Sequence, residues 1–200
     1  MSRLQASIFP LLLVVAALGC NESSTAPMAS AQPDLLALNL SHESAAGGRQ
    51  SFGFNGRAKG FPTGEVFLTG GGAYDPATAS NVVPTDTTFA HSGGGFRCIT
   101  GVAQGPLTGC ALGEGVRWDT AQLLASTSFK CSAADPLKPA ATGDKTVVLL
   151  ADFYRAGDGI DESFTAQMIV SEGDLADNIP GVQNLWIQGV GCGTAVVNFN

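Results

Sequence analysis

The sequence predicts an all-β fold: a single antiparallel β-sandwich or barrel-like domain of about eight strands with long Gly/Pro loops. The first observation is composition, because 26 of 200 residues are glycine and only 14% are charged, against about 7% and 25% in an average soluble chain. The second is that apolar and polar residues alternate along most segments, which is the period of a strand. The third is a hydrophobic content of 44% with 11 phenylalanines, which supplies a core and argues against disorder.

Alternation predicts the strands one by one. They are expected around residues 36–40, 51–55, 65–69, 89–99, 146–154, 163–171 and 186–199, the last supplying one or two closing strands. The turn-rich segment 155–162 makes the two strands beside it the clearest hairpin. Both faces of 146–154 begin apolar, as in a central strand. Residues 117–130 stay ambiguous, because 121–125 fit a helical turn whereas 126–131 look extended.

Glycine and proline mark the connections. Long proline-containing loops are expected at residues 74–88, 101–115, 132–144 and 172–184. Two glycine triplets, residues 70–72 and 93–95, are interpreted as the matching ends of two adjacent strands. They are not phosphate loops, because neither precedes Lys-Ser or Lys-Thr.

The N-terminal segment predicts export. Arg3 precedes an uncharged stretch, residues 8–19, that is too short to span a membrane and fits the apolar part of a secretory signal. The segment ends Ala17-Leu18-Gly19-Cys20, and here the chain resembles the bacterial lipoprotein signal, whose lipobox ends in an acylated cysteine. The usual pattern has Leu and then a small residue where this chain has Ala17 and Leu18, so ordinary cleavage with a free Cys20 is the alternative.

This resemblance predicts how the chain is divided and where in the cell it lies. It implies a signal peptide at 1–19, lipidation (palmitate) of Cys20, a flexible Ser/Thr/Ala/Pro-rich tether at 20–34 and a β domain at 35–200. The partner is then a membrane, reached through the lipid anchor. Asn21 stands where an Asp would signal inner-membrane retention, which favours the outer membrane of the cell envelope. The domain would lie in the periplasm or at the cell surface.

The remaining cysteines predict disulfide bonds. Cys98, Cys110, Cys131 and Cys192 are an even number in an exported chain, and four cysteines allow three connectivities. Local closure favours Cys98 with Cys110, which leaves Cys131 with Cys192. No pair is spaced Cys-x-x-Cys and both histidines are far from any cysteine in sequence, so neither a zinc site nor another metal or cofactor is predicted.

The charge distribution excludes nucleic acid as a partner. The net charge is −7, and no run of Lys or Arg is present to displace phosphate counterions. The acids gather late in the chain, where residues 144–200 hold eight acids and two bases, a net charge of −6. Acidic loops of this kind usually keep a protein soluble.

No catalytic motif is present, so no catalytic residue is predicted. Gly-x-Ser-x-Gly, Ser-x-x-Lys and His-Glu-x-x-His are all missing. His91 and Ser92 are neighbours, but adjacent strand residues face opposite sides, and His42 is expected to be solvated near the tether.

Carboxylates and aromatic residues leave two alternatives open. The acids of the turn (Asp158, Asp161 and Glu162) and of the next loop (Asp174 and Asp177) are interpreted as solvated rather than as a calcium site. Glu65 and Asp152 are the strand candidates for a glycosidase-like carboxylate pair. Trp118, Tyr154 and Trp186 form either a sugar-binding face or, as favoured here, part of the core.

Residues 50–200 are also similar to an uncharacterised group of exported bacterial proteins. The similar stretches are residues 115–120 (Gly-Val-Arg-Trp-Asp-Thr), 150–155 (Leu-Ala-Asp-Phe-Tyr-Arg) and 186–193 (Trp-Ile-Gln-Gly-Val-Gly-Cys-Gly). This resemblance implies export and a single domain but no substrate. The sequence therefore predicts a lipid-anchored envelope protein whose disulfide-stapled β domain is a non-catalytic binding or structural module. The alternative is a secreted hydrolase that uses dispersed Asp and Glu residues.

Overall fold

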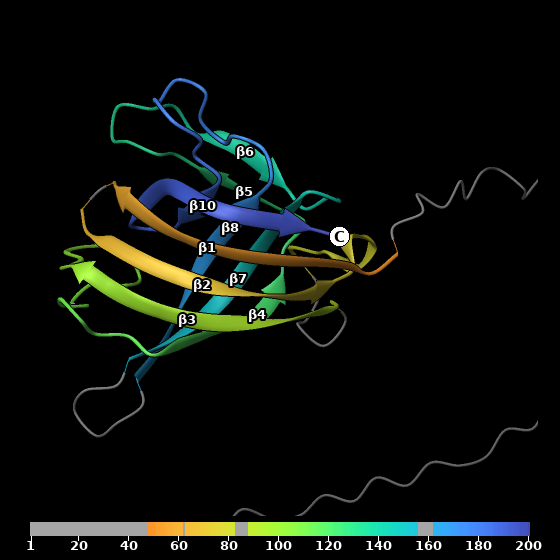
Figure 1. Cartoon of the computed structure of the whole chain (residues 1–200), viewed down its shortest axis with the longest axis horizontal. Helices are drawn as coiled ribbons and strands as arrows, with labels where there is room; N and C mark the ends of the chain where they lie inside the picture. Colours follow the sequence, from red (N-terminus) through yellow and green to blue (C-terminus); the bar gives the residue numbers. More distant parts are fainter. Residues whose placement is uncertain (1–47, 62, 83–87, 156–161) are drawn as a thin grey trace, which may run out of the picture. The chain divides into compact units, whose positions relative to one another are not determined.

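A closed antiparallel barrel of eight strands forms the domain, which confirms the predicted all-β, barrel-like class. The computed structural model describes residues 48–61, 63–82, 88–155 and 162–200. Around the barrel the strands follow the order β1-β10-β9-β8-β7-β4-β3-β2, and β5 and β6 pair as a separate two-stranded sheet (Figure 1). A single turn of 3-10 helix, Pro76–Thr78, follows β2.

The strands have the following bounds: β1 Gln50–Gly60, β2 Glu65–Tyr74, β3 Ala90–Thr100, β4 Arg117–Leu123, β5 Ser126–Phe129, β6 Lys138–Ala141, β7 Thr146–Arg155, β8 Glu162–Ser171, β9 Leu185–Ile187 and β10 Gly191–Phe199. The expected hairpin is present as β7 and β8, whose register runs from Thr146 opposite Ser171 to Arg155 opposite Glu162. Val147 and Val148 are both fully buried, as expected for a strand covered on both faces. The strand expected at residues 36–40 lies outside the described residues.

One ambiguity is resolved and one local prediction is wrong. In the ambiguous segment 117–130 the helical turn at 121–125 is not formed, because β4 runs on to Leu123, whose side chain is fully buried in the barrel, whereas the extended part is present as β5. The register of β4 shifts between Thr120 and Gln122, and this irregularity conceals the strand period. The expected loop 132–144 contains β6, which pairs with β5 although Pro139 has no N–H to donate. Such a strand is tolerated in a two-stranded sheet, where every strand is an edge.

The glycine triplets face each other across two adjacent strands, as expected, but within the strands and not at their ends. Gly70 lies opposite Gly94, and Gly94 lies opposite Trp118 of β4. A Cβ atom at Gly70 would lie 2.5 Å from Cζ2 of Trp118. The missing side chains thus leave room for the indole of Trp118, which is fully buried and donates from Nε1 to the carbonyl of Thr69 at 3.1 Å.

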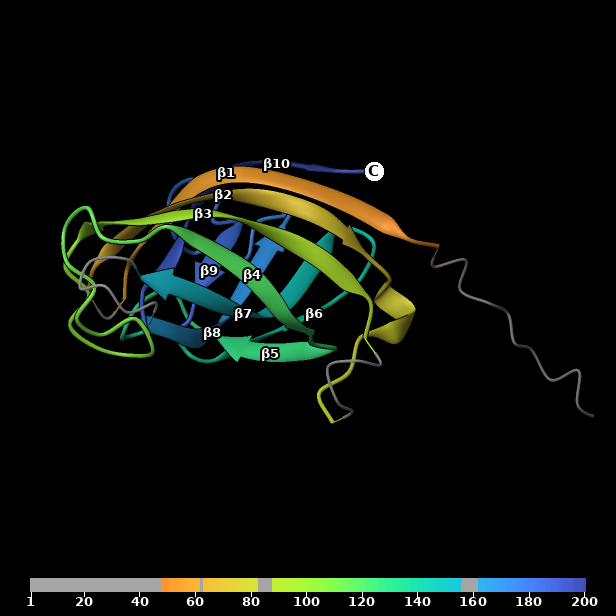
Figure 2. The ribbon, with the colours of Figure 1, turned by 90° about the horizontal axis from the view of Figure 1, so that it is seen from below.

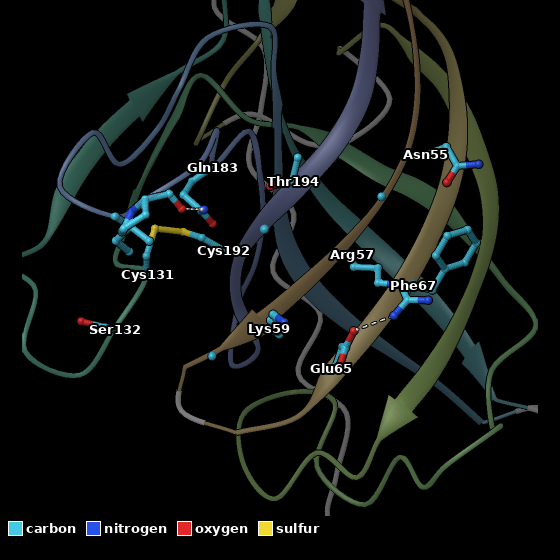
Figure 3. A pocket seen from close by; sticks show the side chains of 15 residues that line it. Asn55, Arg57, Lys59, Glu65, Phe67, Cys131, Ser132, Gln183, Cys192 and Thr194 are labelled. Atoms are coloured by element: carbon cyan, nitrogen blue, oxygen red, sulfur yellow. Dashed lines mark hydrogen bonds and ion pairs between the residues drawn. A yellow bond between two sulfur atoms is a disulfide. The ribbon is translucent and has the colours of Figure 1, made fainter.

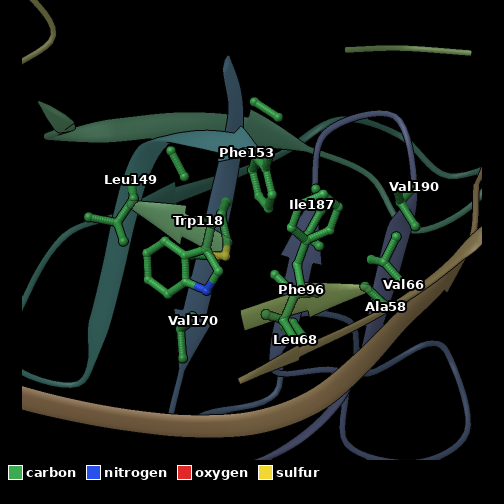
Figure 4. Close-up of a cluster of buried hydrophobic side chains, with 14 of the residues drawn as sticks. Ala58, Val66, Leu68, Phe96, Trp118, Leu149, Phe153, Val170, Ile187 and Val190 are labelled. Carbon is green, nitrogen blue, oxygen red and sulfur yellow. The ribbon is translucent and has the colours of Figure 1, made fainter. Parts of the chain in front are cut away.

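Apolar side chains fill the interior of the barrel. Trp118, Phe96, Phe153 and Ile187 come from different strands and point into one cluster (Figure 4). The rings of Phe96 and Phe153 meet edge-on, with centroids 5.1 Å apart. A small eight-stranded barrel has an interior just wide enough for its own side chains, so the lumen is a core.

A second apolar cluster covers one outer wall of the barrel. Trp186 of β9 lies 6.0 Å from Phe129 of β5, ring centroid to ring centroid, and its Nε1 donates to the carbonyl of Lys130. Val148 and Ile169 of the barrel pack into the same cluster. Figure 2 shows β1, β2, β3 and β10 along one side of the barrel and β5 on the opposite side. Among the described residues, no such layer therefore covers most of the outer face of the strands β10, β1, β2 and β3.

Both disulfides form in the pairing that local closure favours. Cys98 of β3 is bonded to Cys110 in the following loop, with Cα atoms 6.2 Å apart. Cys131, just after β5, is bonded to Cys192 of β10, with Cα atoms 4.8 Å apart. The second bond ties the covering layer to the strand at the border of the uncovered face.

Tyr74 closes the end of β2 with a buried hydroxyl. The hydroxyl donates to the carbonyls of Gly143 and Asp144, at 2.8 and 3.2 Å. Burial, followed by the charge of Asp144, raises the pKa of Tyr74 from 10.0 to about 12. Because this folded-state pKa exceeds the unfolded one, the phenol stabilises the fold fully below pH 10, and its contribution is lost as the pH rises through about 12.

We expect Tyr74→Phe to cost about 1 kcal/mol of unfolding free energy near neutral pH, through the lost hydrogen bond. The difference in unfolding free energy between wild type and variant should shrink as the pH rises above 10. Above that pH the phenol of the unfolded wild type is ionised and must take up a proton on folding, whereas the phenylalanine of the variant has no such group. Urea unfolding at a series of alkaline pH values measures both. A difference that stays constant across the series would contradict the assignment.

Candidate functional site

A recess lies on the outer face of the barrel where the covering layer stops. It has a volume of about 770 Å³. Its floor is formed by outward side chains of β1, β2 and β10, and its wall by the Cys131–Cys192 disulfide and the loop around residues 179–183 (Figure 3). We call this the outer-face recess, and it is lined by Asn55, Arg57, Lys59, Glu65, Phe67, Ser132, Gln183 and Thr194, among others.

A second hollow continues the first across the sheet. It has a volume of about 590 Å³ and is lined by Arg97, Ile99 and Val116. Arg57 and Phe67 line both hollows. The two form one surface that crosses β10, β1, β2 and β3, and from here on the name outer-face recess covers both hollows.

Strand alternation and register together bring the lining side chains into position. Residues 55, 57 and 59 of β1 point outward because the residues between them point into the barrel. The register then places Thr194, Arg57, Phe67 and Arg97 side by side, one from each of four neighbouring strands. A half-buried aromatic ring thus lies between two arginine positions.

The face is positively charged although the chain is acidic. Arg57 pairs with Glu65 at 3.2 Å, and their side chains are 60% and 18% exposed. Of the described acids only Glu65 lines either hollow, against the three bases Arg57, Lys59 and Arg97. Lys59 and Arg97 have neither an ion-pair nor an aromatic partner within the described ranges.

The other described bases are all engaged. Each contacts an acid or a ring: Arg49 with Phe89, Arg117 with Asp119 and Tyr154, Lys130 with Phe61, Lys138 with Asp177, Lys145 with Glu172, and Arg155 with Glu114. Among the described residues, the bases without a partner therefore lie on one face of the barrel, the face with the two hollows.

The carboxylates proposed for a hydrolase are not brought together. Glu65 is on β2 and Asp152 on β7, and β3 and β4 lie between those strands. Asp152 instead lies opposite Asp119 of β4 on the outer surface. The sequence could not reveal this pair, because it depends on the register between strands far apart in the chain.

The acidic loop residues have structural contacts. Asp174 accepts hydrogen bonds from the backbone N–H groups of Ala176 and Gln183, both at 3.0 Å, and so shapes its loop. Asp177 is exposed and pairs with Lys138. Asp158 and Asp161 lie outside the described residues, and only the backbone of Glu162 is described, at the start of β8. Among the described residues no three His, Cys, Asp or Glu side chains are grouped so as to hold a metal ion.

The histidine and aromatic candidates do not form a site together. His91 is exposed on β3 with its ring against Phe89, and His42 lies outside the described ranges. The alternative that Trp118, Tyr154 and Trp186 share a sugar-binding face is wrong. The first lies inside the barrel, the third lies under the covering layer, and Arg117 stacks on Tyr154 at 4.5 Å.

Sequence reasoning missed the functional candidates Arg57, Lys59, Phe67 and Arg97. The available signal was the outward alternation of Arg57 and Lys59 in one strand. Their meeting with Phe67 and Arg97 needed the register.

Comparison with known proteins adds no relative. No protein-family model, no curated protein and no solved structure matches this chain. Within the described part of the chain, no helix is both long enough and apolar enough to cross a membrane.

Proposed function

We propose that this protein is a lipid-anchored component of the bacterial cell envelope whose disulfide-stapled β domain is a non-catalytic binding module. The observation that carries the binding role is the outer-face recess, a positively charged hollow on a net acidic chain. The interior of the barrel is filled by its own side chains, so a ligand is taken on the outside.

The recess is built to be rigid. Its floor consists of three paired strands, and its wall is held to the floor by the Cys131–Cys192 bond. A preformed hollow binds with a smaller loss of conformational freedom than a surface that must first be ordered. This geometry supports a binding role, whereas the separated positions of Glu65 and Asp152 give no support to hydrolysis.

The proposed location in the cell envelope rests on the N-terminal segment and on the cysteines. The segment 1–19 reads as a signal peptide, Cys20 as the lipidated residue and 20–34 as the tether. Asn21 favours the outer membrane. Disulfides of this kind persist in oxidising compartments outside the cytoplasm, and the two bonds in the barrel agree with that location.

We expect Cys20→Ser to release the protein from the membrane fraction and to abolish its labelling by radioactive palmitate. The reason is that one thioether-linked and acylated cysteine would carry the whole anchor. Fractionation of the bacterial host with detergent phase partitioning measures the first result and autoradiography the second. Ser23→Ala, three residues further on, is the matched control and should behave as wild type. Unchanged partitioning and labelling of the Cys20→Ser chain would exclude the anchor.

A further inference from the structure

We propose that the outer-face recess binds an acidic polysaccharide, one whose repeating sugars carry carboxylates. This inference rests on the proposed binding function and assigns its ligand class. It is carried by three properties of this surface: the unengaged cations Lys59 and Arg97, the row formed by Arg57, Phe67 and Arg97, and the polar groups beside them.

The positive charge of the recess favours an anionic ligand. Lys59 and Arg97 have no partner among the described residues, and Arg57 shares Glu65 with no other base. Lys59 and Arg97 therefore bind a carboxylate without first breaking an internal ion pair, and Arg57, which pairs with Glu65 through Nη1, has further guanidinium N–H donors. The planar guanidinium of arginine matches a carboxylate with two parallel hydrogen bonds, so carboxylates suit Arg57 and Arg97 especially well.

The row of side chains across three strands favours a ligand with repeating units. Arg57, Phe67 and Arg97 lie opposite one another on β1, β2 and β3, so the two arginine Cα atoms are separated by two strand spacings, roughly 10 Å. The half-buried ring of Phe67 lies between them. A polymer that carries an acid on successive units, with an apolar sugar face between, fits this order of groups. Because the two hollows share Arg57 and Phe67, such a chain can extend across four strands.

The remaining lining favours sugar over peptide. Extended peptides commonly add to a free sheet edge, but this barrel is closed and β1, β2, β3 and β10 each have two neighbours. The other polar side chains of the recess include Asn55, Gln183 and Ser132, which donate to and accept from hydroxyl groups. A bilayer surface fits poorly, because the cations lie in a hollow beside a wall.

The test uses the full chain in detergent and polygalacturonate as the probe. We expect calorimetric binding at physiological ionic strength. The double variant Lys59→Gln/Arg97→Gln should weaken it about tenfold, because each exposed ion pair contributes modestly. Neither residue has an internal partner, so the variant should keep its fold, which circular dichroism and thermal unfolding verify. Phe67→Leu, which keeps apolar bulk but removes the ring, should also weaken binding of the sugar polymer.

The matched control is Lys138→Gln/Lys145→Gln, which removes the same charge at β6 and just before β7, away from both hollows, and should leave the affinity within about twofold. Fully methyl-esterified polygalacturonate, which has the same backbone without charge, should not bind. Failure of polygalacturonate to bind, or binding that is insensitive to Lys59→Gln/Arg97→Gln, would overturn the proposal.

Two further probes separate the ligand class from the binding role. If polyglutamate or vesicles containing phosphatidylglycerol bind as tightly and lose affinity in the same double variant, the recess is an anion site but the polysaccharide assignment is wrong. If no anionic probe binds to the folded protein, both the polysaccharide assignment and the binding role proposed for this face are wrong. Membrane anchoring is judged separately by Cys20→Ser.

Discussion

Alanine at Gly94 is expected to destabilise the barrel by about 3 kcal/mol or to prevent its folding, the upper range for an overpacked core. The Cβ atom would lie 1.9 Å from the carbonyl oxygen of Thr69 and 2.5 Å from the Cα atom of Gly70. Both are backbone atoms of the paired strand β2, so no side-chain rotation relieves the contact. The strands would have to separate, and the contact of Trp118 with Thr69 would be lost with them.

Gly95→Ala, at the next residue of the same triplet, is the matched control. Its Cβ atom would point outward and meet the Cγ2 atom of Thr69 at 3.5 Å and the carbonyl oxygen of Val116 at 3.7 Å, both ordinary van der Waals distances. Its unfolding free energy should stay within about 1 kcal/mol of wild type, with a gain from the reduced freedom of the unfolded chain. Chemical denaturation of both variants gives the comparison. Equal stabilities would show that the close approach of β2 and β3 is not a constraint.

Removal of the Cys131–Cys192 bond is expected to have the second large effect. The bond closes a loop of 61 residues, for which the chain-entropy account gives about 4 kcal/mol of stabilisation. Cys131→Ser/Cys192→Ser should therefore lower the unfolding free energy by about that amount. It should also loosen the covering layer, because both cysteines belong to the apolar cluster around Phe129 and Trp186.

The double variant Cys98→Ser/Cys110→Ser provides the comparison. Its bond closes only 12 residues, so the same account gives about 3 kcal/mol. The fluorescence of Trp186 adds a local readout, since that ring should become solvated only when the Cys131–Cys192 bond is absent. An equal or larger loss in the Cys98→Ser/Cys110→Ser variant would show that loop length does not govern the contribution of these bonds.

Much of the fold was accessible from local patterns, and the misses share one cause. The β7–β8 hairpin is predictable because alternation continues to both sides of one turn. The end of β4 was not, because the register shift near Gln122 breaks the alternation. β6 was missed because its residues, Lys-Pro-Ala-Ala, show no apolar alternation, and it exists through pairing with β5.

The candidate site was less accessible than the fold. Alternation shows that Arg57 and Lys59 point to one side of β1, but not which side chains of other strands lie beside them. Phe67 is ten residues away and Arg97 forty, and only the pairing of three strands places them with Arg57. The same holds for Asp119 and Asp152, which the register sets opposite each other.

The sequence by itself determined the all-β class, the use of four cysteines as disulfides and the expectation of a lipid anchor at Cys20. Each depends on composition, on a period of two residues, or on a short motif read along the chain. Tertiary structure alone decided that the barrel closes, that Gly70 and Gly94 accommodate Trp118, and that three cations share an uncovered face. These features depend on strand register and on which wall receives the β5–β6 layer. Register results from contacts between residues distant in the chain, which local periodicity does not specify.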